Sequence, residues 1–279
     1  VNYTSPFLNR LNSNNAQTLV RNTVQSSVNY STTIPNTPWS LSASMNMNQD
    51  LATRVTSLTL PDLALTRART FPFRSRGVAR PWRDKIGLSY SAQATNRVTT
   101  YDSLLFTPQM LDTMNHGLRQ NIGIGANYNV LQYIVLNPQF TYNEYTYLYQ
   151  NQQNYEIVDN VRTSIDPETG DTVYTVVPTE QVVTNRVGGL NTGRDFNISL
   201  SASTNIYSLW QPRWSKRQFA LRWTARPSTG YNYRPDFGTP NWDYYRTIYG
   251  ETGNEYTYSR FDGLVYGGPP RGEQQVINF

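Results

Sequence analysis

The feature that most constrains this chain is an alternation of apolar and polar side chains with a period of two residues. Between Trp39 and Asn48, every odd-numbered residue is apolar and every even-numbered residue is small and polar. Successive side chains of a β-strand point to opposite faces of the sheet, so this segment predicts a strand with one apolar and one polar face. The same pattern recurs in long segments along most of the chain. It is typical of a β-barrel whose outside meets lipid and whose inside meets water.

Length and composition agree with such a barrel. The chain has 279 residues, enough for one large all-β domain. A spanning helix needs about 20 consecutive apolar residues, and the apolar runs here are far shorter, so helical membrane spans are excluded. The mean hydropathy of −0.59 is compatible with a barrel because half of each strand faces the lumen. Aromatic residues make up 13% of the chain, with 21 Tyr, which suits the aromatic belts of membrane interfaces.

The alternation predicts an antiparallel transmembrane β-barrel of which about ten strands are present. The expected strands cover 16–34, 39–48, 55–69, 85–99, 118–128, 134–149, 196–206, 219–231, 256–266 and 274–279. The alternation changes phase at Pro61, which predicts a bulge or an edge there. The last segment is shorter than the roughly 9–11 residues that a spanning strand needs. We therefore expect residues 1–279 to be an open segment of a larger barrel, and the chain to be part of a longer protein.

The links between the expected strands predict sidedness. Outer-membrane barrels alternate short periplasmic turns with long extracellular loops. Short links at 35–38, 129–132, 213–217 and 267–272 are expected at one rim. Long links at 101–116, 150–193 and 234–255 are expected at the outer rim, the first with room for a short helix. Within 150–193, which we expect to be extracellular, a turn sequence at 166–171 between two β-prone runs predicts a hairpin.

Candidate catalytic and metal-binding residues are scarce. The chain has no cysteine and a single histidine, His116, which is expected in a solvent-exposed loop. Without a second histidine or a thiolate at ligand spacing, no metal site or cofactor is predicted. No nucleophile motif, phosphate-binding loop or dinucleotide fingerprint occurs, so an enzyme is not expected.

Arginine supplies nearly all of the positive charge of the chain. The formal net charge is +5, and lysine occurs only at Lys85 and Lys216. The arginines are scattered rather than gathered in a stripe, so nucleic-acid binding is not predicted. Four of them fall on the polar side of their strands and are candidates for lining the lumen: Arg97, Arg119, Arg222 and Arg226. They would either pair with lumen acids and line water, or line a route for an anionic amphiphile such as a phosphorylated glycolipid.

An ordered set of short motifs resembles a divergent branch of the LPS-assembly protein LptD family. The set covers most of the chain from Phe71 onward. It comprises Phe71-Pro72-Phe73-Arg74, the run from Pro81 to Ser91, Asp102-Ser103-Leu104-Leu105-Phe106, Asn115-His116-Gly117-Leu118-Arg119, the run from Phe196 to Ser203, Tyr233-Arg234-Pro235-Asp236-Phe237-Gly238, Asp243-Tyr244-Tyr245, Tyr266-Gly267-Gly268-Pro269 and Arg271-Gly272.

The resemblance implies a barrel in the cell outer membrane, surrounded by outer-membrane lipid, with a periplasmic domain and a plug formed by an LptE-like lipoprotein. Such a barrel takes lipopolysaccharide from periplasmic Lpt bridge proteins and releases it sideways into the outer leaflet. Two departures stand out: about ten strands is fewer than the family's barrel has, and the periplasmic domain is absent. Arg222-Trp223 also replaces an Arg-His pair of the family. Residues of the lateral gate are therefore not assigned.

Other functions remain open from the residues alone. A general porin or small-solute channel would share the polar lumen without lipid traffic. A structural or adhesive surface barrel would use its long loops to bind partners. An outer-membrane lipase is the least favoured, since His116 has no nucleophile motif beside it.

Overall fold

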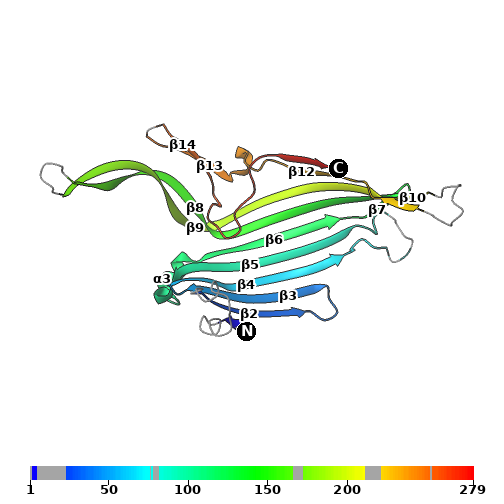
Figure 1. Cartoon of the computed structure of the whole chain (residues 1–279), viewed down its shortest axis with the longest axis horizontal. Helices are drawn as coiled ribbons and strands as arrows, with labels where there is room; N and C mark the ends of the chain where they lie inside the picture. The colour runs from blue at the N-terminus through cyan, green and yellow to red at the C-terminus, as the bar shows by residue number, and fades with distance from the viewer. Residues whose placement is uncertain are drawn as a thin grey trace.

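The computed structural model describes residues 2–4, 23–75, 77, 82–165, 172–210, 221–251 and 253–279. In this part of the chain, antiparallel strands form one broad sheet in which sequence neighbours lie side by side (Figure 1). The order is β1-β2-β3-β4-β5-β6-β8-β9-β12-β15, and β7 pairs with β8 beside this row. The expected antiparallel all-β barrel wall is therefore confirmed. No helix among the described residues is long and apolar enough to cross a membrane.

The strands of the sheet are β1 (Asn2–Thr4), β2 (Thr23–Thr33), β3 (Trp39–Asp50), β4 (Val55–Thr70), β5 (Gly87–Tyr101), β6 (Asn115–Gly125), β7 (Tyr128–Val130), β8 (Ile134–Ile165), β9 (Thr172–Thr204), β12 (Ser228–Arg234) and β15 (Gln274–Asn278). Two short hairpins lie outside it, β10 (Ile206–Trp210) with β11 (Leu221–Ala225), and β13 (Tyr245–Tyr249) with β14 (Glu255–Ser259).

The strand register places the apolar residues of successive strands on one face. Ala43 pairs with Leu63, Leu88 with Ile124, and Leu200 with Tyr231, whereas Ser42 pairs with Ala64 and Ser201 with Gly230. Side chains of paired residues lie on the same side of a sheet. One face of the sheet is therefore apolar and partly exposed, and the other is built largely from Ser, Thr, Asn and Gln.

The bulge expected at Pro61 is present. Register shifts lie between Ser44 and Asn46 on one side of β4, and between Thr59 and Asp62 on the other. Leu58 pairs with Met47, and Leu63 pairs with Ala43, so both leucines lie on the apolar face despite their opposite parity. The bulge absorbs the phase change of the sequence pattern and keeps that face continuous.

The link between β5 and β6 contains the short helix for which the sequence has room. It forms a 3-10 turn η1 (Asp102–Leu104) and helix α3 (Pro108–Thr113). Met110 of α3 is buried with Leu58 and Val98 at this end of the sheet.

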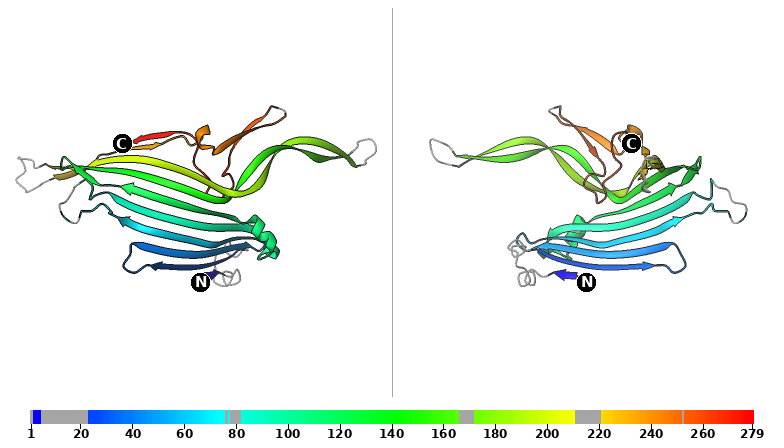
Figure 2. Two further views of the ribbon diagram at one scale, coloured as in Figure 1. Left: turned by 180° about the vertical axis from the view of Figure 1, so that it is seen from behind. Right: turned by 45° about the vertical axis from the view of Figure 1, so that its right-hand side comes forward.

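Residues 150–193 form the predicted hairpin, since β8 and β9 stay paired from Ile134↔Thr204 out to Ile165↔Thr172. Their far part extends well beyond the other strands (Figure 2). The turn sequence at 166–171 lies outside the described residues.

The prediction of a spanning strand at 256–266 was wrong. Only Glu255–Ser259 is a strand there, and it pairs with β13 in a small hairpin rather than with the sheet. All of 235–273 is one connection from β12 to β15, which pair directly with each other. The link 267–272 consequently lies within this long connection and not at the short-link rim. The alternation at 256–266 reflects packing of the connection itself, as described below.

Of the first expected strand, the structure describes β2 from Thr23 to Thr33, and 16–22 lie outside the described residues. The unforeseen β1 pairs with β2 at the edge of the sheet. Among the described strands, β1 and β15 end the row and do not pair with each other. The described part of the sheet is thus open, as the sequence predicts.

Candidate functional site

The polar face of β2 to β5 forms a groove of about 750 Å³ near the end of the sheet that carries α3. Arg97 lies in it, and its register partners are Thr59 on β4 and Asn115 on β6. The rest of the lining is almost entirely neutral and polar: Gln25, Ser26, Ser27, Asn46, Met47, Asn48, Ser57, Thr59 and Thr99. Within the described residues, Arg97 is exposed and forms no ion pair. The groove therefore presents a positive charge among hydroxyl and amide groups.

Arg119 lies on the same face, one strand away. It pairs in register with Gln93 and Tyr145, and its guanidinium carbon is 5.7 Å from the centre of the Tyr145 ring. The structure thus places Arg97 and Arg119 on neighbouring strands of one polar surface.

The other two arginines lie apart from this pair. Arg222 is on the β10–β11 hairpin at the opposite end of the sheet, 5.4 Å from the centre of the Tyr207 ring. Arg226 lies in the break between β11 and β12, where it lines a pocket with Ile134, Ala202 and Phe279. The four candidate arginines therefore do not form one cluster, and their role in lining a lumen stays a prediction.

A second part of the polar face is covered by protein. We call residues 235–273, which connect β12 to β15, the covering segment; they include β13, β14 and a short 3-10 turn η2 (Pro240–Trp242). The segment packs on the polar face of β5, β6, β8 and β9. Its Phe237, Tyr244, Phe261 and Leu264 are buried together with Tyr145, Tyr147 and Tyr149 of β8. The largest aromatic cluster of the described chain thus sits on the face that is otherwise polar.

Hydroxyl groups of tyrosines fasten the covering segment to the wall. Tyr147 is fully buried, and its hydroxyl donates to the Gly267 carbonyl at 2.6 Å. Tyr266 reaches the other way and donates to the Gln93 carbonyl at 3.0 Å, and it also hydrogen-bonds the Thr95 hydroxyl at 2.7 Å. Thr95 in turn donates to Asp62 at 2.6 Å. A polar chain therefore links the segment to the bulged strand β4.

Asparagine side chains add a second set of fastenings. Asn115 donates to the Gly263 carbonyl at 2.7 Å and accepts the Val265 N–H at 2.9 Å. Asn151 donates to the Asp262 carbonyl at 2.7 Å. These bonds satisfy backbone groups of the segment that have no strand partner. They fix its turn at 262–265 against β6 and β8.

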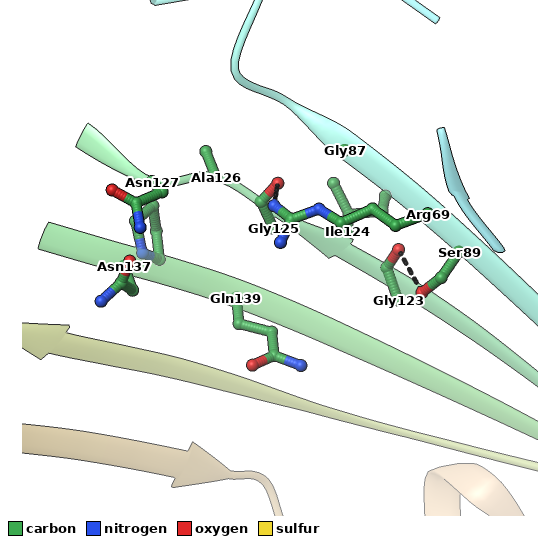
Figure 3. A pocket seen from close by; sticks show the side chains of 11 residues that line it. Arg69, Gly87, Ser89, Gly123, Ile124, Gly125, Ala126, Asn127, Asn137 and Gln139 are labelled. Atoms are coloured by element: carbon green, nitrogen blue, oxygen red, sulfur yellow. Dashed lines mark hydrogen bonds between the residues drawn. The ribbon is translucent and has the colours of Figure 1, made fainter. Parts of the chain in front are cut away.

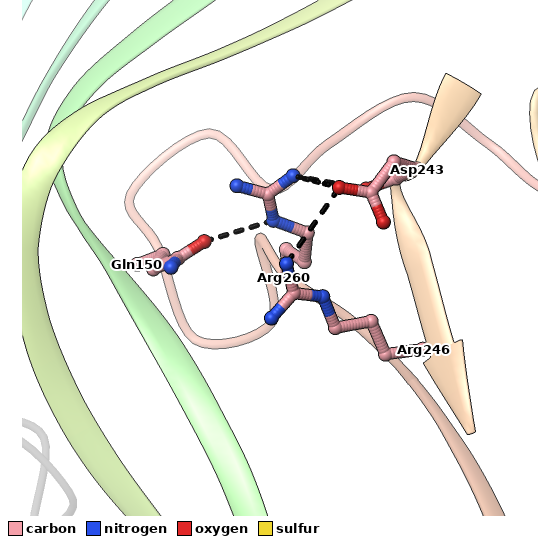
Figure 4. Close-up of polar contacts among 4 residues, drawn as sticks. All are labelled: Gln150, Asp243, Arg246 and Arg260. Carbon is pink, nitrogen blue, oxygen red and sulfur yellow. Dashed lines mark hydrogen bonds and ion pairs between the residues drawn. The ribbon is translucent and has the colours of Figure 1, made fainter. Parts of the chain in front are cut away.

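A charged cluster braces the segment internally and against β8 (Figure 4). Asp243 accepts from Arg260 at 2.7 Å and lies 3.6 Å from Arg246. Arg260 also donates to the Gln150 side chain at 2.8 Å. The cluster is partly exposed, so its importance lies in fixing geometry rather than in a large electrostatic stabilisation.

Glycines allow the segment to approach the strands closely. A Cβ on Gly193 would lie 2.8 Å from Pro269 and 2.9 Å from Phe261. A Cβ on Gly117 would lie 2.6 Å from Tyr147 and 3.0 Å from Val265. Each glycine thus leaves space that another residue fills.

The covering segment also protects the edge of β9. Pairing of β12 with β9 ends at Tyr233↔Ile198, and beyond that point the Arg194 N–H donates to the Tyr244 hydroxyl at 3.0 Å. Phe237 packs edge-on against Phe196, with ring centres 5.6 Å apart. A strand edge without a partner strand is covered here by a folded loop, as soluble sheets also do.

The expectation for His116 was wrong. His116 lies within β6 opposite Asn96, is half-buried, and its ring centre is 5.1 Å from that of Tyr149. The strand begins at Asn115, so it includes His116 as its second residue. Among the described residues, no group of three or more His, Asp or Glu side chains is arranged to hold a metal ion.

The residues that hold the covering segment were not identified as functional from the sequence. A signal was present, because Tyr145, Tyr147 and Tyr149 occupy alternate positions of one strand on the polar side. Large aromatic residues on a water-facing side indicate that something other than water covers them.

A protein-family model described as "LptD protein" matches residues 1–279, the full length of the chain. Neither the curated proteins nor the solved structures contain a significant match to it.

Proposed function

Because the chain belongs to the LptD family, we propose that its sheet is the wall of a barrel that inserts lipopolysaccharide into the outer leaflet. Proteins of this family act in lipopolysaccharide transport at the outer membrane and are not enzymes. The proposal adds that the apolar face meets membrane lipid, and that the polar face lines the interior through which the saccharide part of the substrate passes.

The observation that carries this proposal is the groove around Arg97. Lipopolysaccharide has an anionic, hydroxyl-rich headgroup, and guanidinium groups bind phosphate and carboxylate in a bidentate manner. In the described chain Arg97 has no acidic partner, while hydroxyl and amide side chains surround it. An arginine that served only to balance a lumen acid would be ion-paired.

The proposed partners are those that the family resemblance implies. We propose that the barrel receives its substrate from periplasmic Lpt bridge proteins and is plugged by an LptE-like lipoprotein. The rim with the β8–β9 hairpin would then be extracellular, and the rim with the β2–β3 and β6–β8 turns periplasmic. The polar face of β2 to β4, and of β5 around Arg97, has the space for a plug or a substrate, whereas the covering segment lies on that face of β6, β8 and β9 around Tyr145 and Tyr147.

Site-specific photocrosslinking in cells tests the proposal. A photoreactive residue at Thr99, in the groove, should form adducts with lipopolysaccharide, and one at Val28, on the apolar face, should not form adducts with the saccharide part. Arg97→Gln should weaken the Thr99 adduct, whereas Arg67→Gln, on the apolar face, should leave it unchanged. Adducts absent from Thr99, with small anions passing the barrel freely, would favour a general porin instead.

A further inference from the structure

A second recess opens on the polar face at the opposite end of the sheet from the Arg97 groove (Figure 3). It has a volume of about 260 Å³ and lies where β4, β5, β6 and β8 approach the short-link rim. The residues that give it its character are Arg69, Ser89, Asn127, Asn137 and Gln139. Among the described residues, no acidic side chain lines it.

The recess exists because glycines, which have no side chain, occupy neighbouring positions on this face. Gly87 of β5 pairs with Gly125 of β6, and Ser89 pairs with Gly123, so glycine occurs three times on adjacent positions of one face. A Cβ on Gly87 would collide with the Arg69 side chain. The guanidinium of Arg69 therefore lies against the sheet rather than projecting from it (Figure 3).

Arg69 is held in place but retains hydrogen-bonding capacity. Its Nη2 donates to the Gly125 carbonyl at 2.6 Å, and its guanidinium carbon is 5.6 Å from the centre of the Phe71 ring. Within the described residues it forms no ion pair. A guanidinium has several N–H groups, so one fixed bond orients the group and leaves others directed to the recess.

Three amide side chains around Arg69 also keep hydrogen-bonding capacity within the described part of the chain. Asn127, Asn137 and Gln139 make no hydrogen bond to other described residues, while Ser89 donates weakly to the Gly123 carbonyl at 3.3 Å. Three amide groups and an oriented guanidinium, with no acidic side chain among the described lining residues, match a ligand that carries both hydroxyl groups and a negative charge. The recess is smaller than the roughly 300–1,000 Å³ typical of pockets that enclose drug-sized ligands, so it fits a headgroup substituent and not acyl chains.

We infer that this recess binds a phosphorylated sugar of a glycolipid headgroup at the short-link rim, with Arg69 on the phosphate. The inference rests on the proposed function, because it makes the recess an early contact for the substrate entering from that rim. It adds a second binding site, separate from the Arg97 groove, and names the phosphorylated sugar as the part of the substrate that is bound there. Inorganic phosphate shares part of this chemistry, so the test must separate the two sources.

The experiment places a photoreactive residue at Asn127, an exposed lining position, in the full-length protein in cells. Lipopolysaccharide adducts are expected at Asn127, and Arg69→Gln should lower their yield about tenfold or more, the usual effect of losing a charged hydrogen bond. Gln retains a donor for the Gly125 carbonyl, so the sheet should persist. Arg67→Gln is the matched control, since Arg67 pairs in register with Trp39 and Tyr90 on the apolar face.

Competition on the purified full-length protein identifies the group that is bound. Glucosamine 6-phosphate should suppress the Asn127 adduct, whereas glucosamine and inorganic phosphate at the same concentration should do so at least several-fold less. Equal suppression by inorganic phosphate would show a simple anion site and overturn the inference. Adducts at Thr99 but none at Asn127, or an Asn127 yield unchanged by Arg69→Gln, would overturn it while leaving the proposed function intact. Loss of adducts at both positions in the unsubstituted protein would instead reject the proposed function.

Discussion

The strands β2 to β5 and the strands β6 to β9 follow one sequence rule but differ on their polar face. In the first group this face is open except where Tyr266 of the covering segment reaches Gln93 and Thr95 of β5. Its groove is lined by Ser, Thr, Asn and Gln around Arg97. In the second group the covering segment lies on it, and Tyr145, Tyr147 and Tyr149 of β8 are buried beneath. The apolar face is alike in both groups, with Ala43 paired to Leu63 and Leu200 paired to Tyr231.

This difference shows that the residue types on the polar face depend on what lies against that face. Where water or a substrate meets the wall, small polar residues suffice. Where a loop of the same chain packs on it, aromatic residues take the inward positions because burying them contributes to stability. Inward tyrosines on a barrel strand therefore predict a loop folded onto the wall.

The sharpest test removes the central aromatic residue of the covered half. Tyr147→Ala should destabilise the covered region by about 3–5 kcal/mol, the usual cost of truncating a fully buried aromatic side chain. Chemical unfolding in detergent, followed by Trp242 fluorescence, measures it. Asn48→Ala, on the bare polar face, should change stability by no more than about 0.5 kcal/mol. Equal effects of the two substitutions would break the comparison.

The shared apolar face can be tested in both halves. An arginine at a lipid-facing position near the bilayer midplane costs about 2–4 kcal/mol. Ala43→Arg and Leu200→Arg should both show this loss, while Ser42→Arg and Ser201→Arg, one residue away, should fold nearly as well as the unsubstituted protein. Heat-dependent mobility of the folded barrel on gels gives the readout. A tolerated Leu200→Arg would mean that protein, not lipid, lies against this face of β9.

A smaller effect is expected from filling the space between the covering segment and β9. Gly193→Ala places a methyl group against Pro269 and Phe261, and such overpacking costs about 1–3 kcal/mol. Gly188→Ala is its control on the same strand, since nothing lies within 4 Å of that Cβ. Proteolysis of the covering segment should accelerate in the first variant alone. Equal proteolysis rates in both variants would show that the covering segment accommodates the methyl group without losing stability.

The sequence predicted most of the wall because alternation is a local property. Strand positions from Trp39 to Ser203 and the bulge at Pro61 needed only the two-residue period and the known effect of proline. The sequence failed at 256–266, where alternating residues such as Tyr256 and Tyr258 resemble a spanning strand but form a short hairpin. A period of two shows that a segment is extended and does not show which strand it pairs with.

The candidate site was predictable only in part. The position of Arg97 and Arg119 on the polar face was predictable, because charged residues on a polar strand face are conspicuous in the sequence; their role in lining a lumen stays a prediction. Arg69 was not, since its position depends on glycines that are remote in sequence, at Gly87 and Gly125. The fastenings of the covering segment likewise join residues more than 100 positions apart, as between Tyr147 and Gly267, and no local pattern reports such distant pairs.

The smallest expected effect concerns Asp236, which fastens the two ends of the covering segment together. Its carboxylate accepts the Gly238 and Gly272 N–H groups, both at 2.7 Å. These bonds favour the charged form and lower the pKa of Asp236 below its ordinary value. A carboxyl group with a lowered pKa in the folded state contributes stability above its unfolded pKa, near 3.9, and loses it as the pH falls through the folded value.

The two hydrogen bonds of Asp236 should therefore contribute the same stability between about pH 5 and 8. They should weaken only in acid, below the ordinary carboxyl pKa. Asp236→Asn keeps an acceptor oxygen but removes the charge that strengthens both bonds. Hydrogen–deuterium exchange of residues 237–273 at pH 6 should be faster in Asp236→Asn than in the unsubstituted protein, with no change in β2 and β3. After correction for intrinsic rates, this difference should vanish at a pH below the folded pKa, where Asp236 is itself neutral. A difference that persists in acid would mean that the substitution acts through packing, and that charge at Asp236 does not hold the segment on the wall.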